Sequence, residues 1–245
     1  MEWSDYGTVL GAQPFGETGA RVEVFTQNHG RHAGLVRGGA GRKRAPDLQP
    51  GTYVSVTWRA RLGEHLGVFS LEAERARAAA LLADRLALSG LNAVCGLSLV
   101  GLPERQTLPD FHKATETLFD LMTLTPAWTL AYLRWEVDLL EVLGAGLDLT
   151  RCAVSGDQSD LQFISPKTGR AVSADAAGEW ADRLLPFPAV LKGEGTAPDR
   201  EILDGLDVTG HFLTRAFRLQ GIELPPARAR LLDAIARHSA GTKTS

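Results

Sequence analysis

Residues 21–37, RVEVFTQNHGRHAGLVR, decide the fold of the N-terminal part of the chain. Val22 and Val24 alternate with polar residues, which is the period-two pattern of a strand with one buried face. Asn28-His29-Gly30 comes next, and asparagine and glycine tolerate the positive φ angles of a tight turn. The segment Arg31 to Arg37 then returns along the first strand. This pattern predicts a β-hairpin.

Three further short strands surround this hairpin. Gly7 to Gln13 comes before it, while Thr52 to Arg61 and Leu66 to Leu71 follow the glycine-rich loop Gly38 to Pro50. So many short strands in residues 7–71 leave no room for crossover helices, so the strands cannot form a parallel sheet. We expect a five-stranded antiparallel barrel or small sandwich over residues 1–76, with Trp58 and Phe69 in its core.

The pattern changes to a helical one after Leu71, and the chain is therefore expected to be an α+β protein. A helical domain is expected over residues 77–150 and 177–240, with a knuckle and short hairpin inserted at 151–176. Thr125 is the expected N-cap of one helix, with Pro126 at its first position. The expected helices are Glu72 to Leu88, Ala93 to Leu102, Asp110 to Met122, Thr125 to Leu143, Ala177 to Leu185, Asp199 to Gln220 and one from Pro226 to about His238, with a loop from Gly193 to Pro198.

Charge is unevenly distributed along the chain. The whole chain has a net charge of −3, but residues 20–62 contain eight basic and two acidic residues, giving +6 there and −9 elsewhere. The basic residues are Arg21, Arg31, Arg37, Arg42, Lys43, Arg44, Arg59 and Arg61. Such asymmetry indicates a polyanionic partner, although the acidic part of the chain could instead balance these charges in space.

A basic barrel surface can bind single-stranded nucleic acid. Guanidinium groups neutralise backbone phosphates, while exposed aromatic rings stack on unpaired bases. Phe25 and Tyr53 face away from the predicted core and are the candidate stacking rings. Arg215 and Arg218 on a later helix form a second candidate DNA patch.

Motifs of enzymes are absent from the sequence. It contains no Gly-Lys pair of a phosphate loop, no His-Glu-x-x-His and no Gly-x-Ser-x-Gly. The run Gly38-Gly39-Ala40-Gly41 leads into Arg42-Lys43-Arg44 and Pro46 instead of a helix, so a nucleotide site is not expected there. We therefore expect a protein that is not an enzyme and has no small-molecule substrate.

The N-terminus lacks the features of a secretion signal, and no apolar run has the ~18 residues of a membrane span. We expect a cytoplasmic, nucleoid-associated protein without a membrane partner. Cys95 and Cys152 lie far apart in the sequence, and a disulfide is not expected.

Three stretches resemble the RecO family of bacterial DNA repair and recombination mediators. The first is Tyr6 to Leu10 followed by Val22 to Arg31 and the basic loop after it. The second is Leu133 to Gly144, leading through Leu147-Asp148-Leu149 to Cys152-Ala153-Val154-Ser155-Gly156, and the third is Phe163 to Val172. The resemblance covers nearly the whole chain and rests on the order and spacing of these stretches, since no single motif is diagnostic.

The resemblance implies an OB-fold barrel, a helical bundle, and a small ribbon that in many members binds zinc through two Cys-x-x-Cys pairs. Cys152 occupies the first ligand position, but Ser155, Ser173 and Ala176 occupy the others. A closed zinc site needs four soft or imidazole ligands, so this pattern supports no firm cofactor. Asp157, Asp160 or Asp175 could supply oxygen ligands, which leaves zinc at Cys152 open.

The resemblance also implies a function. Family members bind single- and double-stranded DNA, anneal complementary strands and, with RecR, help to load the RecA recombinase onto DNA coated by single-strand-binding protein (SSB), whose C-terminal tail is a partner. The basic residues of the predicted barrel indicate by themselves only that the protein binds some polyanion. An adaptor without DNA affinity of its own is the alternative, and a hydrolase or transferase would need a site that the sequence does not show.

Overall fold

The computed structural model describes residues 1–193 and 198–242. The contacts divide the chain into two compact units. The first comprises Met1–Pro126 and Pro225–Leu231, and the second the described residues of Ala127–Leu224 and Leu232–Ser245. The loop expected from Gly193 to Pro198 falls largely outside the described residues.

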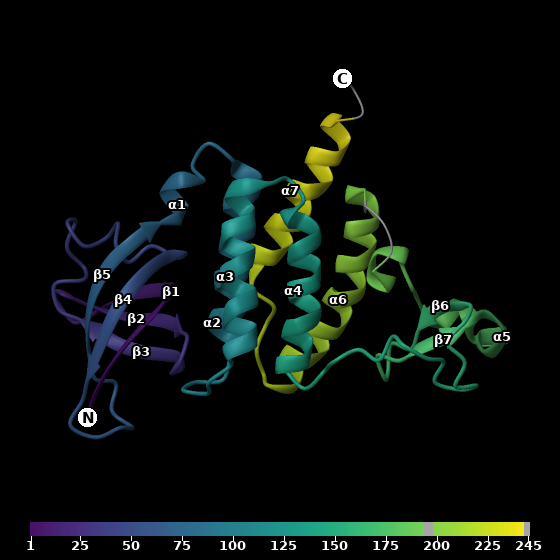
Figure 1. The fold of residues 1–245 in the computed structure, drawn as a ribbon, viewed down its shortest axis with the longest axis horizontal. Helices are drawn as coiled ribbons and strands as arrows, with labels where there is room; N and C mark the ends of the chain where they lie inside the picture. Colours follow the sequence, from purple (N-terminus) through teal and green to yellow (C-terminus); the bar gives the residue numbers. More distant parts are fainter. Residues whose placement is uncertain (194–197, 243–245) are drawn as a thin grey trace. The chain divides into compact units, whose positions relative to one another are not determined.

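Five strands form a closed barrel in the first unit, in the order β1-β2-β3-β5-β4 (Figure 1). The strands are β1 (Glu2–Phe15), β2 (Gly19–Thr26), β3 (Gly30–Val36), β4 (Thr52–Arg59) and β5 (Val68–Ala76). All neighbours run antiparallel except β3 and β5, which pair in parallel at Leu35 and Val68. The expectation of an antiparallel barrel is therefore wrong at this pair. Strand direction cannot alternate all the way around a ring of five, so one pair must be parallel.

Alternate residues of the strands fill the barrel. Val22 and Val24 of β2 are fully buried, as the period-two pattern predicted. Trp58 and Phe69 are also buried in this core, which confirms their predicted position. The remaining members of the core cluster are Val9, Ala20, Val36, Leu48, Val54, Val56 and Leu71.

Strand β5 continues to Ala76, so the helix predicted from Glu72 is wrong in its first turn. Backbone pairing with β4 places Glu72 opposite Ser55 and Arg75 opposite Tyr53. A ladder partner therefore outweighs the helix propensity of this stretch. Two helices follow, the short α1 (Arg77–Ala80) and α2 (Arg85–Gly101), which begins at the N-cap Asp84.

Helix α2 replaces the two helices predicted on either side of Gly90. Gly90 is buried inside α2, and the helix packs against β1. Helix α3 (Pro109–Leu124) agrees with its prediction. It covers part of the outer barrel surface, where Phe111 and His112 lie 6.2 and 5.0 Å from the ring of Phe25.

A buried arginine joins α3 to the barrel. The side chain of Arg77 is only 4% exposed, and its Nη2 lies 2.5 Å from Glu116 Oε2. Its Nη1 donates to Thr8 on β1 at 2.9 Å, and Thr8 in turn donates to Glu116 at 2.6 Å. These bonds fix which barrel strands α3 covers.

The second unit contains a helix pair and a small sheet. Helices α4 (Trp128–Val142) and α6 (Asp199–Leu219) pack together, and α7 (Pro226–Thr242) begins in the first unit and ends in the second. The predicted N-cap Thr125 is wrong, because Thr125 ends α3 and Ala127 precedes α4. The small sheet has the order β7-β6-β8 and consists of β6 (Leu161–Ile164), β7 (Ala171–Ser173) and β8 (Leu185–Pro186). Along the chain, α5 (Ala174–Ala177) and the 3₁₀ helix η1 (Gly178–Arg183) lie between β7 and β8, and the 3₁₀ helix η2 (Ala189–Lys192) follows β8.

Candidate nucleic-acid interface

The loop between β3 and β4 lies beside the tip of the β1–β2 hairpin. Gly19 pairs with Phe15 across this hairpin, and the neighbouring Ala20 pairs with Val36 at the end of β3. The backbone N–H of Ala40 donates to the carbonyl of Thr18 at 3.1 Å. One backbone hydrogen bond and the strand register therefore bring two sequence-distant loops together.

Three cations on this loop are available to a ligand. Arg37, Arg42 and Lys43 are exposed, and within residues 1–193 and 198–242 none of them has a carboxylate partner. Phe15 at the hairpin tip is 50% exposed. We call Phe15, Arg37, Arg42 and Lys43 the basic loop face. Phe15 was missed in the sequence, although an aromatic residue in the turn Pro14-Phe15-Gly16 is a usable signal.

Arg44 has a different role from its neighbours. Its Nη1 donates to the carbonyl of Leu71 at 3.2 Å and lies 3.4 Å from Asp47 Oδ2. These contacts fasten the loop to β5. Arg44 thus positions the cations that come before it.

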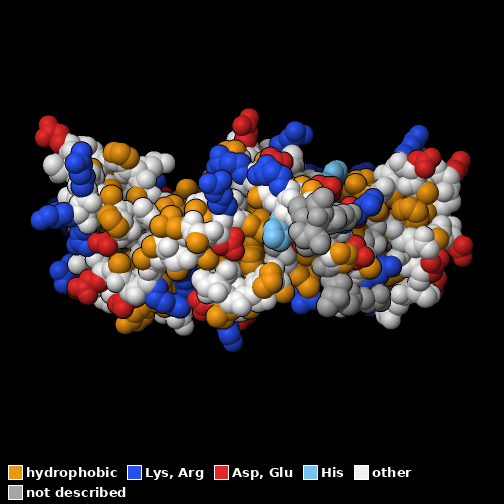
Figure 2. All heavy atoms as spheres, turned by 90° about the horizontal axis from the view of Figure 1, so that it is seen from above, with side chains coloured by type: hydrophobic (Ala, Val, Ile, Leu, Met, Phe, Trp, Pro, Cys, Tyr) orange, Lys and Arg blue, Asp and Glu red, His pale blue; other side chains and the backbone are white. Residues whose placement is uncertain are grey.

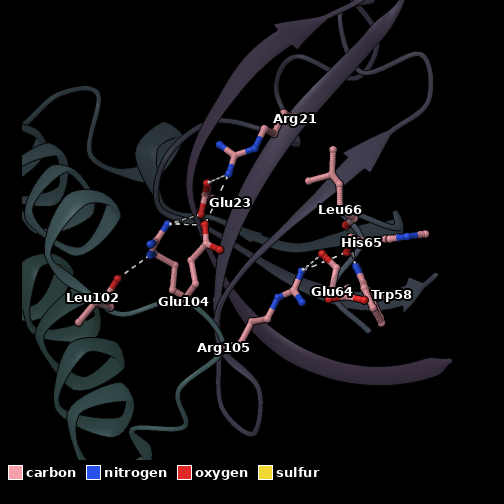
Figure 3. A network of polar contacts seen from close by, with 10 residues as sticks. Arg21, Glu23, Trp58, Glu64, His65, Leu66, Leu102, Glu104 and Arg105 are labelled. Carbon is pink, nitrogen blue, oxygen red and sulfur yellow. Dashed lines mark hydrogen bonds and ion pairs between the residues drawn. The ribbon is translucent and has the colours of Figure 1, made fainter. Parts of the chain in front are cut away.

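Arg21 and Arg31 lie in a compensated cluster of charges, of which Figure 3 labels Arg21, Glu23 and Glu104. Glu23 Oε1 lies 2.6 Å from Arg21, and its Oε2 accepts from Arg31 at 2.7 Å. Glu104 lies 3.7 Å from Arg21 and 3.6 Å from Arg31. Two carboxylates therefore offset both guanidinium groups, and neither is a free cation as the sequence suggested.

The segment after α2 holds this cluster on the barrel. Arg31 Nε donates to the carbonyl of Leu102 at 2.7 Å, and the N–H of Arg105 donates to the carbonyl of Arg31 at 2.8 Å. The Arg105 side chain donates to the carbonyls of Glu64 and His65 in the β4–β5 loop (Figure 3). It also donates to the carbonyl of Gly63. Its φ of 61° is unusual for a residue with a side chain. The segment covers part of the β2–β3 surface.

Arg59 and Arg61 lie at the end of β4. Arg59 pairs with Glu2 at 2.8 Å, and both side chains are well exposed, so this pair is easily screened. Arg61 is exposed without an ion pair in the described part of the chain. On the face shown in Figure 2, basic and acidic side chains lie interspersed over the barrel, at the left. On this face the barrel is not uniformly basic.

The two candidate stacking rings have different surroundings. Phe25 points away from the barrel core, as predicted, but α3 covers it and leaves it 0% exposed. Phe25 is therefore wrong as a stacking residue. Tyr53 is half-buried, and its ring stacks on Tyr6 at 6.1 Å with an interplanar angle of 11°. Arg75 lies over the Tyr53 ring at 4.6 Å.

The second predicted patch lies on α6 in the second unit. Arg215 is exposed, but its Nη1 donates to the carbonyls of Pro166 and Lys167 in the β6–β7 turn. His211 contacts the same Pro166 carbonyl at 3.1 Å. Arg215 therefore positions the turn, while Arg218 is exposed without an ion pair among the described residues.

Cys152 is buried between serines instead of metal ligands. Its Sγ accepts from the Ser173 backbone N–H and hydroxyl, both at 3.4 Å. Burial raises the pKa of Cys152, but hydrogen bonds from Ser155 and Ser173 outweigh it and lower the pKa to about 6. Across residues 1–193 and 198–242, no three His, Cys, Asp or Glu side chains are placed to hold a metal ion. The donor set does not fit zinc.

Comparison with known proteins decides the family. The model described as "Recombination protein O N terminal" matches residues 1–75, and "Recombination protein O C terminal" matches residues 82–221. The chain belongs to the RecO family. The resemblance stated from the sequence is thereby confirmed.

RecO relatives match over almost their full length. A DNA repair protein RecO of Cereibacter sphaeroides strain ATCC 17023 is 55% identical over 97% of this chain and 100% of its own. The DNA repair protein RecO of Ruegeria sp. strain TM1040 is 54% identical, and that of Dinoroseobacter shibae is 49% identical. Each of these two matches covers 97% of this chain and 99% of the relative. Like them, this chain is a RecO-family DNA repair protein.

In the described residues, no helix is long and apolar enough to cross a membrane.

Proposed function

We propose that this RecO-family chain binds single- and double-stranded DNA without sequence preference through the basic loop face. The observation that carries this proposal is a set of three exposed cations, without carboxylate partners among the described residues, on the loop beside the hairpin tip that carries the exposed Phe15. Such cations release condensed counterions from a phosphate backbone, and a ring can stack on an unpaired base. The barrel is an OB-fold in this proposal, since a five-stranded barrel that binds oligonucleotides is typical of that fold.

Family membership supports the finer part of the proposal. The chain anneals complementary strands and, together with RecR, helps RecA to load onto SSB-coated single strands, with the C-terminal tail of SSB as a contact. It acts by binding and not by catalysis. It works in the cytoplasm at the nucleoid.

A salt titration tests DNA binding. The variant Arg37→Ala/Arg42→Ala/Lys43→Ala should bind DNA more weakly and reduce the slope of log affinity against log salt by up to about three units. Arg59→Ala is the single-charge comparison and should change the slope by less, because Glu2 lies 2.8 Å from Arg59. An unchanged slope in the triple variant would remove the loop from the interface.

The adaptor remains the second candidate, and the compensation of Arg21, Arg31 and Arg59 by carboxylates favours it. An adaptor would show no DNA affinity of its own at about 50 mM salt. The wild-type titration at low salt therefore separates the two candidates.

A further inference from the structure

A polar hollow crosses the outer surface of β1, β4 and β5, away from the basic loop face. Its volume is ≈ 510 Å³. The strand register places its hydroxyl groups in rows, because Ser4 pairs with Thr57 and Thr57 pairs with Ser70. The hydroxyls of Ser4 and Thr57 are 2.8 Å apart. Gln27 and Asn28 add amide groups from the β2–β3 turn.

An exposed aromatic ring borders this hollow. Tyr6 lines it and is 51% exposed, although large exposed aromatics are uncommon. Its ring stacks on Tyr53, and the guanidinium of Arg75 lies over Tyr53. The ring of Tyr6 is therefore supported on one side by the Tyr53 ring, yet half of its surface remains in solvent.

A carboxylate holds this part of the wall in place. Asp5 accepts from the backbone N–H groups of Tyr6 and Asn28, both at 2.8 Å, and pairs with His29. Burial raises the pKa of Asp5, but these hydrogen bonds together outweigh it and lower the pKa. Because both carboxylate oxygens of Asp5 already accept hydrogen bonds from the protein, Asp5 holds Tyr6 and the β2–β3 turn in place. Glu72 is exposed at the other side of the hollow and has no ion pair in the described part of the chain.

The groups of this hollow suit an unpaired nucleobase better than a phosphate. Hydroxyls and amides both donate and accept, as base edges do, and a carboxylate can accept from an exocyclic amino group. The nearby cation Arg75 already pairs with Asp120 at 3.1 Å, so little positive charge is left for phosphates. A base in a duplex is stacked and paired and cannot lie flat on Tyr6.

We propose that Tyr6 and the polar hollow beside it bind unpaired bases of single-stranded DNA. This inference rests on the proposed DNA-binding function and adds to it a subsite for bases. The loop cations bind the backbone of single and double strands alike, whereas the hollow distinguishes a single strand from a duplex.

The test compares Tyr6→Ala with Tyr6→Phe by fluorescence anisotropy on a mixed-sequence single strand and on a blunt duplex. Tyr6→Ala should weaken single-strand binding about 5- to 150-fold, the range that one base–aromatic stack provides. It should leave duplex affinity and the salt slope unchanged, and Tyr6→Phe should bind like the wild type. Equal losses on both DNAs, or no loss, would overturn the subsite.

A second variant keeps the test informative if Tyr6→Ala does not fold. Ser70 is exposed at the hollow and pairs with Thr57, whereas Tyr6 pairs with Ser55, so Ser70→Leu places an apolar side chain in the hollow at a different register position from the Tyr6–Tyr53 stack. It should also lower single-strand affinity selectively, and unchanged affinity would contradict the inference. A wild-type protein that binds neither DNA overturns the proposed function as well. If the loop variant loses DNA binding while Tyr6→Ala and Ser70→Leu bind single strands like the wild type, only the base subsite is overturned.

Discussion

Arg31 on β3 donates from Nη1 to Glu23 Oε2 on β2 at 2.7 Å, and the two side chains are only 14% and 6% exposed. The same guanidinium donates from Nε to the carbonyl of Leu102. An arginine that sequence alone places on a DNA-binding surface thus holds a strand pair and the segment after α2 together. We therefore expect removal of the Arg31 side chain to lower the stability of the fold more than the affinity for DNA.

We expect Arg31→Ala to lower the free energy of unfolding by about 1–3 kcal/mol, because Glu23 and the Leu102 carbonyl lose a buried donor. Urea denaturation measures this change. Arg42→Ala is the control, since its exposed side chain makes no ion pair in the described chain and should change stability by less than about 0.5 kcal/mol. An Arg31→Ala protein of wild-type stability that no longer binds DNA would instead make Arg31 an interface residue.

We expect Glu104→Gln to strengthen DNA binding. Glu104 is half exposed and lies within 3.7 Å of both Arg21 and Arg31, so its loss leaves one positive charge uncompensated. The slope of log affinity against log salt should steepen by up to about one unit. Glu179→Gln, which changes an exposed carboxylate of η1 in the second unit, should leave the slope as it is. Equal slopes for both variants would show that DNA does not approach Arg21 and Arg31.

The barrel should lose stability as the pH falls from about 6.5 to about 4. His32 is 4% exposed among Trp3, Trp58 and Phe69, and no hydrogen-bond partner of its ring nitrogens lies in the described residues. Burial lowers its pKa to about 4, and the positive charges of Arg105 and His29 add to this. In the unfolded chain, histidine has a pKa near 6.5 and is protonated over this pH range, whereas His32 in the folded barrel stays neutral down to about pH 4. Falling pH therefore favours the unfolded state.

The stability lost over this pH range through His32 is on the order of 3 kcal/mol. Urea denaturation at pH 7 and pH 4.5 measures it. His32→Phe keeps a ring of similar size in the aromatic cluster and should reduce the pH dependence, while the contributions of His112 and Asp5, whose pKa values are also lowered, remain. An equally steep loss in this variant would assign the effect to other groups.

Chelation should leave the protein intact. Cys152 accepts hydrogen bonds from Ser173, and the described residues contain no group of three His, Cys, Asp or Glu side chains that could hold a metal ion. We therefore expect far less than one zinc per chain and an unchanged Tm after treatment with EDTA. Elemental analysis and thermal unfolding check both points. Stoichiometric zinc that is lost in Cys152→Ala would contradict this prediction.

Local patterns predicted much of the fold. The alternation around Val22 and Val24 and the Asn28-His29-Gly30 turn correspond to β2, β3 and their connection, and the helical spacing of residues 110–122 corresponds to α3. The errors lie where a partner distant in sequence decides the outcome. Residues 72–76 are a strand because β4 pairs with them, and α2, which packs against β1, runs on through the buried Gly90.

The candidate site was predicted in composition but not in arrangement. A count of charges found the basic segment, and three of its cations, Arg37, Arg42 and Lys43, are exposed on one loop. The count could not show that Glu104, far along the chain, would approach Arg21 and Arg31. Tyr6 was missed because its role depends on Tyr53 and the hollow beside them.

By itself the sequence determined the strand periodicity, the turn chemistry, the excess of arginine and the likeness to RecO, because each of these is carried by the order of residues along the chain. Only the tertiary structure decided which arginines remain free and which rings remain exposed. Ion pairing and burial depend on groups that meet only when the barrel closes and α3 packs on it. For this reason Phe25, on the predicted outer face, is covered, while Tyr6 lies open beside the hollow.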